Sequence, residues 1–201
     1  MQIDLKNISK RFNQELIFKN LSYSFETGKK YAITGPNGSG KSTLLQVISG
    51  YTRPSEGELL YGAGAIEVEE AYKNLSIAAP YLELVEEFTL NEAIDFHFKF
   101  KAPLLSKAEF LDVSYLNNAK DKQVSKFSSG MKQRLKLALA FYSDCPILLL
   151  DEPTTNLDKQ GAKWYQDQIE KVNDKTIIIA SNQPNEYTFC SEVIDITAFK
   201  G

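Results

Sequence analysis

The chain opens with two segments in which apolar and polar residues alternate, and fully apolar runs follow later. IDLKNIS at residues 3–9 and LIFKNLSYSF at residues 16–25 alternate, which predicts strands of an antiparallel sheet with one buried face. KKYAITG at 29–35, PILLLDEP at 146–153 and TIIIASN at 176–182 are short apolar runs, which predict buried strands. The chain is therefore expected to contain both half-buried strands of an antiparallel sheet and fully buried strands.

Helical spacing of apolar residues appears between these strands. It predicts helices at residues 41–50, 89–100, 130–144 and 159–172, with Asp158 placed to cap the last one. Further strands are predicted for GELLYG, for NLSIAAP at 74–80 and for EVIDITAF at 192–199. Residues 101–127 show no clear pattern, and Pro103 interrupts them.

Alternation of strands and helices predicts an α/β fold with a mainly parallel sheet. The first two strands are expected as an antiparallel attachment, and a helical subdomain at about residues 85–143 as an insertion in the core. The length of 201 residues suits one domain, so residues 1–201 are expected to form a single unit of this kind.

Composition narrows the classes of function. The formal net charge of −3 lacks the strong basic field of a nucleic-acid-binding protein, and no apolar run approaches the roughly 20 residues that span a bilayer. Cys145 and Cys190 lie far apart and are expected to be reduced, buried thiols. His97 is expected on a helix surface or in packing, because no cysteine cluster accompanies it to form a zinc site.

A glycine-rich loop between a predicted strand and a predicted helix carries the strongest chemical signal. GPNGSGKS matches G-x-x-x-x-G-K-[ST], in which backbone amides and the helix N-terminus converge on phosphates. Lys41 adds a positive charge, and Ser42 offers a hydroxyl to Mg²⁺. An ordinary glycine turn is the alternative. The candidate nucleotide ligands are Gly35, Pro36, Asn37, Gly38, Ser39, Gly40, Lys41, Ser42 and Thr43.

Two acids end the apolar strand ILLLDEP. The carboxyl end of a parallel strand meets the phosphate loop at one edge of the sheet. Asp151 is therefore expected to join Ser42 at a magnesium ion, and Glu152 to orient or deprotonate an attacking water. A buried strand that ends in solvated acids is the alternative interpretation.

The segment KFSSGMKQRLKLALAFYSDCPILLLDEPTTNLD resembles the ATP-binding cassette (ABC) transporter family. The resemblance runs from about residue 2 to residue 198. It implies a P-loop NTPase core that binds ATP with Mg²⁺ and pairs with a second cassette, in a homodimer or heterodimer. The residues that it implies in contact with the ATP of the second cassette are Ser128, Ser129, Gly130 and Asp158. The resemblance also places Phe12 where an aromatic ring stacks on adenine, although a core aromatic at a strand end is an equal alternative.

The chain departs from the family pattern at two positions. Asn182 stands where the family has a histidine that contacts the γ-phosphate, and an amide can donate a hydrogen bond but carries no charge. Pro80 and Tyr81 stand where the family has a glutamine. The nearby acids Glu83, Glu86 and Glu87 are interpreted as a solvated surface in preference to metal ligands. The expected activity is therefore a slow ATPase.

The resemblance implies a cytoplasmic subunit, peripheral to the inner face of the membrane, that drives separate transmembrane permease subunits through the surface near residues 80–115. Two alternatives stay open. One is a regulatory cassette with little hydrolysis, and the other is a non-transport ABC ATPase that acts on ribosomes or DNA. A turnover assay separates the first alternative from the transporter subunit, and co-purification with a membrane protein separates the second.

Overall fold

In the computed structural model, which describes residues 1–200, the chain divides into two compact units. The first contains residues 1–77, 146–152 and 173–201, and the second contains residues 78–145 and 153–172. The helical insertion predicted at about residues 85–143 falls within the second unit.

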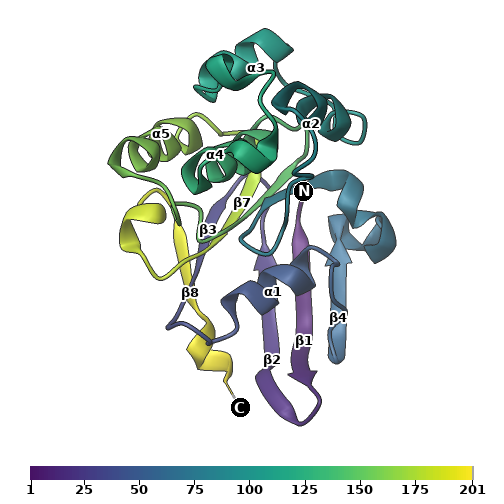
Figure 1. The fold of residues 1–201 in the computed structure, drawn as a ribbon. Coiled ribbons are helices and arrows are strands. Elements are labelled where there is room, and N and C mark those ends of the chain that lie inside the picture. Colours follow the sequence, from purple (N-terminus) through teal and green to yellow (C-terminus); the bar gives the residue numbers. More distant parts are fainter. Residues whose placement is uncertain (201) are drawn as a thin grey trace. The chain divides into compact units, whose positions relative to one another are not determined.

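The first unit contains a three-stranded antiparallel sheet in the order β2-β1-β4 (Figure 1). Its strands are β1 (Ile3–Phe12), β2 (Glu15–Phe25) and β4 (Glu56–Tyr61). The alternating pattern is confirmed, because Ile3, Leu5, Phe18, Leu21 and Phe25 are buried. The pattern did not indicate that β4 would extend this sheet.

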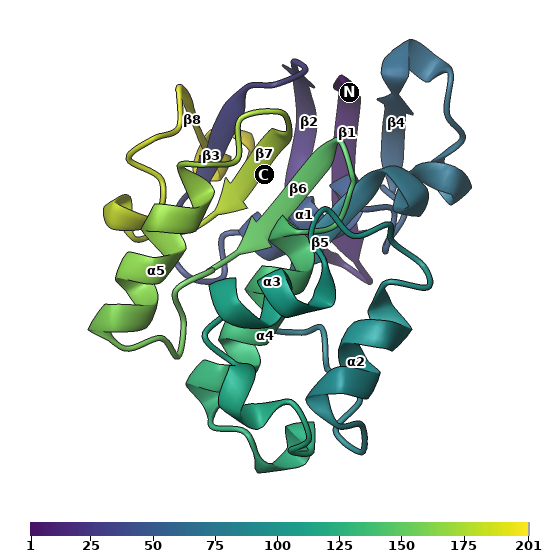
Figure 2. The same cartoon turned by 90° about the horizontal axis from the view of Figure 1, so that it is seen from above.

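The second sheet has five strands in the order β5-β6-β7-β3-β8 (Figure 2). Strands β6, β7, β3 and β8 pair in parallel, which confirms the mainly parallel sheet. All residues of β6 and β7 are buried, as their apolar sequences predict. The bounds are β3 Lys30–Thr34, β5 Leu75–Ala78, β6 Ile147–Asp151, β7 Thr176–Ala180 and β8 Glu192–Asp195, with helix α1 at Lys41–Ile48.

The prediction of a strand through residue 199 is wrong after Asp195. The side chain of Asp195 accepts hydrogen bonds from the amide and the hydroxyl of Thr197, at 2.9 and 2.7 Å. This local pairing turns the backbone into a 3₁₀ helix at Ile196–Phe199. The two bonds also lower the pKa of Asp195.

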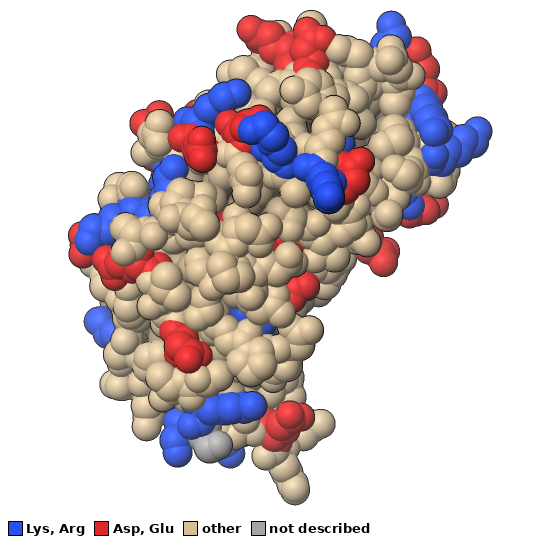
Figure 3. All heavy atoms as spheres, turned by 90° about the vertical axis from the view of Figure 1, so that its left-hand side faces the viewer, with Lys and Arg blue, Asp and Glu red and all other residues tan. Residues whose placement is uncertain are grey.

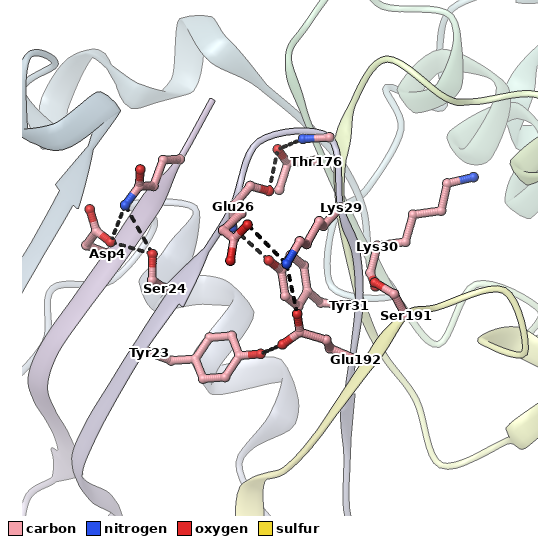
Figure 4. A network of polar contacts seen from close by, with 12 residues as sticks. Asp4, Tyr23, Ser24, Glu26, Lys29, Lys30, Tyr31, Thr176, Ser191 and Glu192 are labelled. Carbon is pink, nitrogen blue, oxygen red and sulfur yellow. Dashed lines mark hydrogen bonds and ion pairs between the residues drawn. The ribbon is translucent and has the colours of Figure 1, made fainter.

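A polar network joins β2 to the beginnings of β3 and β8 (Figure 4). The Tyr23 hydroxyl donates to the Glu192 carboxylate, and Lys29 Nζ pairs with Glu26 at 3.0 Å and with Glu192 at 3.3 Å. The Glu26 amide donates to the Tyr31 hydroxyl at 2.7 Å. The hydrogen bond from Tyr23 lowers the pKa of Glu192, so the carboxylate stays charged and the two sheets are tied by charge-assisted bonds.

The second unit is helical. It contains α2 (Leu90–His97), α3 (Lys107–Val113), α4 (Ser129–Phe141) and α5 (Lys159–Ile169). Helix α3 lies in the segment without a clear pattern. Helices α4 and α5 pack through Phe141, whose ring lies 6.0 Å from Trp164 and 6.2 Å from Tyr165. Trp164 Nε1 also donates to the carbonyl of Val113 at 2.7 Å, so α3 is anchored to α5.

His97 is confirmed as a packing residue. Its Nε2 atom lies 2.9 Å from the hydroxyl of the buried Ser143, which itself donates to the Leu139 carbonyl at 2.7 Å. The two cysteines are free thiols; Cys145 is buried as expected, but Cys190 is only partly buried. None of the helices within residues 1–200 has the length and hydrophobicity that crossing a bilayer requires. Figure 3 shows basic and acidic side chains interspersed over one face.

Replacing His97 by Gln should make folding less sensitive to acid. Burial, aided by the charge of Lys101, lowers the pKa of His97 from 6.5 to about 4. The folded chain therefore favours neutral His97, and this preference destabilises it as the pH falls from 6.5 towards 4, where the unfolded chain alone takes up the proton. We expect His97 to account for about 1–2 kcal/mol of the fall in unfolding free energy between pH 7 and pH 5.

Urea unfolding of both proteins at several pH values measures this difference. If the unfolding free energies of the wild type and of His97→Gln change in parallel with pH, the folded chain does not hold the histidine neutral.

Candidate nucleotide site

The phosphate loop connects the end of β3 to the first residue of α1. Lys41 is 4% exposed, and its Nζ atom donates to the carbonyls of Gly35 at 2.9 Å and Pro36 at 3.2 Å. The ammonium group therefore holds the loop closed and lies beside the amides that follow. The position before the helix, Gly40, has φ 103°, and a Cβ atom there would lie 2.6 Å from Cγ2 of Ile17. Glycine is required for both reasons.

The loop borders a pocket of about 190 Å³. Its lining brings most of the predicted loop residues together with one predicted acid, and it adds a residue of β2 that sequence reasoning missed. The lining residues are Ile17, Asn37, Gly38, Gly40, Lys41, Ser42, Thr43 and Glu152. Gly35, Pro36 and Ser39 are not among them, and the Ser39 side chain is buried. These three therefore shape the loop and do not line the pocket.

Asp151 ends β6 as a buried carboxylate. It is 1% exposed, and neither of its oxygens has a hydrogen-bond partner among residues 1–200. Burial raises its pKa to about 6, while the nearby Ser42 hydroxyl acts against this shift without reaching hydrogen-bond geometry. A dry carboxylate without a partner is destabilising unless a cation compensates it.

This donor set fits Mg²⁺. The ion prefers oxygen ligands and binds through one or two protein groups together with phosphates and water. Asp151 supplies two free carboxylate oxygens, and Ser42 supplies a hydroxyl in its vicinity. Both belong to the same unit as the phosphate loop.

Glu152 follows Asp151 in a strained backbone conformation. Its φ is 45°, which side chains other than glycine rarely adopt, and its amide donates to the carbonyl of Ala180 at 2.9 Å. Such a conformation costs of order 1–3 kcal/mol and is typical of functional sites. The turn directs the Glu152 side chain to the lining of the pocket.

Asn182 lies at the phosphate loop, just beyond the end of β7. Its Nδ2 atom donates to Oδ1 of Asn37 at 2.9 Å. The preceding Ser181 donates its hydroxyl to the carboxylate of the fully buried Glu186 and accepts from the Gln183 amide at 2.9 Å. Sequence reasoning missed Glu186, which fixes the turn that carries Asn182. Phe12 is 46% exposed at the end of β1, so its ring is available to a ligand.

The second unit holds the other predicted residues around the start of α4. The Ser128 hydroxyl accepts from the Met131 amide at 3.2 Å and caps this helix. A Cβ atom at Gly130 would lie 3.1 Å from the carbonyl of Asn156, and Gln133 Nε2 donates to the Pro153 carbonyl at 2.8 Å. The segment that follows the acids therefore lies against the start of α4.

Asp158 caps α5, as predicted, by accepting from the Gly161 amide at 2.7 Å. Ser129 and Asn156 line a hollow of about 430 Å³ in the second unit, which also includes Glu83 and Glu86. Glu86 forms an ion pair with Lys132. The ion pair agrees with the interpretation of Glu86 as a surface acid. Pro80 and Tyr81 belong to this unit as well.

The first unit has the loop, the acids and the sheet of a P-loop nucleotide-binding protein. A family model described as ABC transporter matches residues 18–155. The chain is 35% identical over 194 residues to an uncharacterized ABC transporter ATP-binding protein, YybJ, of Bacillus subtilis (strain 168), covering 92% of this chain and 87% of that protein. The chain therefore belongs to the ABC transporter family and is an ATP-binding cassette.

Other similarities agree. The chain is 31% identical to the Nod factor export ATP-binding protein I of Burkholderia orbicola (strain AU 1054), over 90% of this chain but 62% of that protein's length. A putative ABC transporter ATP-binding protein from Pyrococcus furiosus has a TM-score of 0.84 at 20% identity, with 100% of both chains covered. The dimeric bacterial ABC transporter cassette MJ0796 has a TM-score of 0.83 at 24% identity, over 97% of this chain and 95% of that one. These two structures show the shared fold.

Gly40→Ala should disrupt the phosphate loop, while Gly28→Ala provides a matched control. Both glycines have positive φ, but a Cβ atom at Gly28 meets nothing within 4 Å, whereas at Gly40 it meets Ile17. We expect the control to lose about 1 kcal/mol of stability from backbone strain alone. Gly40→Ala should lower the free energy of unfolding by about 3 kcal/mol, because overpacking adds to the backbone strain. It should also lose affinity for ATP.

Thermal unfolding with and without Mg-ATP measures both effects. Equal losses of stability in the two variants, with ATP protection retained in both, would contradict this account of the loop.

Proposed function

We propose that this cassette binds and hydrolyses ATP, dimerises on ATP, and drives separate transmembrane subunits of an ABC transporter. The observation that carries the proposal is the buried carboxylate of Asp151, which has no hydrogen-bond partner among residues 1–200 and belongs to the unit that holds the phosphate loop. Its desolvation is compensated when a cation and a triphosphate enter. Burial of an unpaired acid at the edge of a nucleotide pocket is otherwise unfavourable.

The phosphate loop binds the triphosphate in this proposal. Lys41 Nζ, which now bonds to two loop carbonyls, turns to the β- and γ-phosphates, and the loop amides and the N-terminus of α1 add further donors. Ser42 and Asp151 hold Mg²⁺. When bound, this ion neutralises charge on the phosphates and orients them for attack.

Glu152 positions the attacking water in the proposed reaction. Its carboxylate accepts a hydrogen bond, or the proton, from the water while the phosphate loop fixes the γ-phosphate. Asn182 Nδ2 exchanges Oδ1 of Asn37 for a γ-phosphate oxygen. Because the amide is neutral, this contact is weaker than one from a charged histidine, so turnover should be slow.

A second cassette completes each nucleotide site in this proposal. Ser128, Ser129, Gly130 and Asp158 of one copy contact the ATP that the phosphate loop of the other copy binds. The start of α4 suits this role, since its amides and the Ser128 hydroxyl can face an anion. A dimeric cassette is among the solved structures with the same fold, which supports pairing as a property of this architecture.

The surface near residues 80–115 is proposed to meet the transmembrane subunits. It carries apolar side chains that are unusually exposed, with Phe96 at 44% and Phe100 at 70%. Their rings stack edge to face at 5.2 Å, and the ring of Phe88 continues the row at 5.4 Å from Phe96. Exposed aromatic patches mark interaction sites. Such a contact would hold the cassette at the cytoplasmic face of the membrane.

A regulatory cassette with little hydrolysis is the second candidate, and Asn182 is the observation that favours it. Its only described side-chain partner among residues 1–200 is Asn37 of the same loop, and it offers no charge to the γ-phosphate. In that case the chain binds ATP and pairs with a catalytic copy, but contributes no turnover of its own.

Glu152→Gln should abolish phosphate release while retaining ATP binding. The amide keeps the size of the side chain and loses the base, so turnover should fall by about 10²-fold or more. Malachite-green detection of phosphate and equilibrium binding of ATP measure the two properties. Glu87→Gln, an exposed acid outside the proposed site, serves as the matched control. Unchanged turnover in Glu152→Gln would contradict the assigned role.

A further inference from the structure

Phe12 is an exposed ring that lies beside a buried charge. It is the last residue of β1, and 46% of it is exposed. An exposed phenyl ring at a strand end has few packing partners to fix its orientation. The ring can present a flat face to a ligand only when another group holds the opposite side.

Lys10 supplies that group. Although charged, Lys10 is 8% exposed, and its Nζ atom lies 4.8 Å from the centre of the Phe12 ring. The same atom donates to Thr52 Oγ1 at 3.0 Å and to the Arg53 carbonyl at 2.7 Å. A lysine ammonium has three donors, so two go to oxygens and one is left for the face of the ring.

Both oxygen partners belong to the loop that follows α1, the helix of the phosphate loop. Ser55 of this loop also bonds to the end of β1: its amide donates to the Ser9 carbonyl at 2.8 Å, and its hydroxyl accepts from the Arg11 amide at 3.0 Å. Lys10 therefore ties the ring to the element that begins at Lys41. The end of β1 and the loop after α1 are therefore joined by these four hydrogen bonds.

We propose that Lys10 is a positioning residue that holds Phe12 as the platform for the nucleotide base. The inference rests on the proposed nucleotide-binding function. The ammonium occupies one face of the ring and leaves the other face free, so the base can stack without first ordering the side chain. An uncharged side chain of equal length would fill the same space but would not attract the ring.

Lys10→Met tests this role with two ligands, Mg-ATP and Mg-tripolyphosphate. Tripolyphosphate has the phosphates but no base. We expect the affinity for ATP to fall about 3- to 10-fold, as for the loss of a desolvated cation–π contact, while the affinity for tripolyphosphate stays unchanged. In steady-state assays the KM for ATP should rise by the same factor with kcat unchanged. Equal weakening for both ligands would overturn the proposal, because Lys10 would then only support the loop.

A double-mutant cycle with Phe12→Leu adds a second criterion. Phe12→Leu alone should weaken ATP binding about tenfold through lost stacking, and Lys10→Met should add nothing further in that background. Additive losses would mean that Lys10 does not act through the ring and would overturn the inference. Thr52→Val removes one hydrogen-bond partner of Lys10, so it should weaken ATP binding by a smaller factor and leave tripolyphosphate binding unchanged. This variant replaces Lys10→Met in the test if Lys10→Met does not fold.

The outcomes separate the inference from the function on which it rests. If the wild-type protein binds neither ligand, the proposed function fails and the inference with it. If the wild type binds both ligands and Lys10→Met binds ATP equally well, the inference alone fails.

Discussion

Three parallel strands that end in register determine where the chemistry of this protein lies. Asp151 of β6 pairs with Ala180 of β7, and Ala180 pairs with Ile33 of β3. The residues that follow these positions are the phosphate loop, Glu152 and Asn182. Because parallel strands end at the same edge, segments more than 100 residues apart in the chain meet around one pocket. A slip of one residue in β6 would turn the Asp151 side chain to the other face of the sheet, away from Ser42.

The burial of these strands also explains why the Asp151 carboxyl group is desolvated. β6 and β7 are buried along their whole length, so an acid at the end of β6 is desolvated before any ligand arrives. The fold therefore desolvates Asp151, which raises the pKa of its carboxyl group to about 6, and a cation bound there would compensate the charge of the carboxylate. Lys10 is a second buried charge in this unit, and its ammonium group contacts two oxygens and the ring of Phe12.

The sequence predicted the parallel strands, the phosphate loop and both acids, because these features depend on local pattern and on spacing within one segment. It did not predict α3, although Ser106 and Glu109 form a capping box there, with the Glu109 amide donating to Ser106 Oγ at 3.3 Å. It did not indicate Glu186, whose carboxylate bonds Ser181 only five residues earlier, and it could not indicate Ile17, which meets the pocket beside residues distant in the chain. The role of Phe12 remained undecided for the same reason: exposure depends on the tertiary fold.

We propose that one cassette holds an incomplete nucleotide site, which a second copy completes. Phosphate release from Mg-ATP, measured over a wide range of protein concentration, tests this most directly. We expect release to rise more steeply than protein concentration when the protein is dilute, and in proportion to protein concentration once dimers dominate. Release that stays proportional to protein concentration throughout the range, or no release at any concentration, would contradict it.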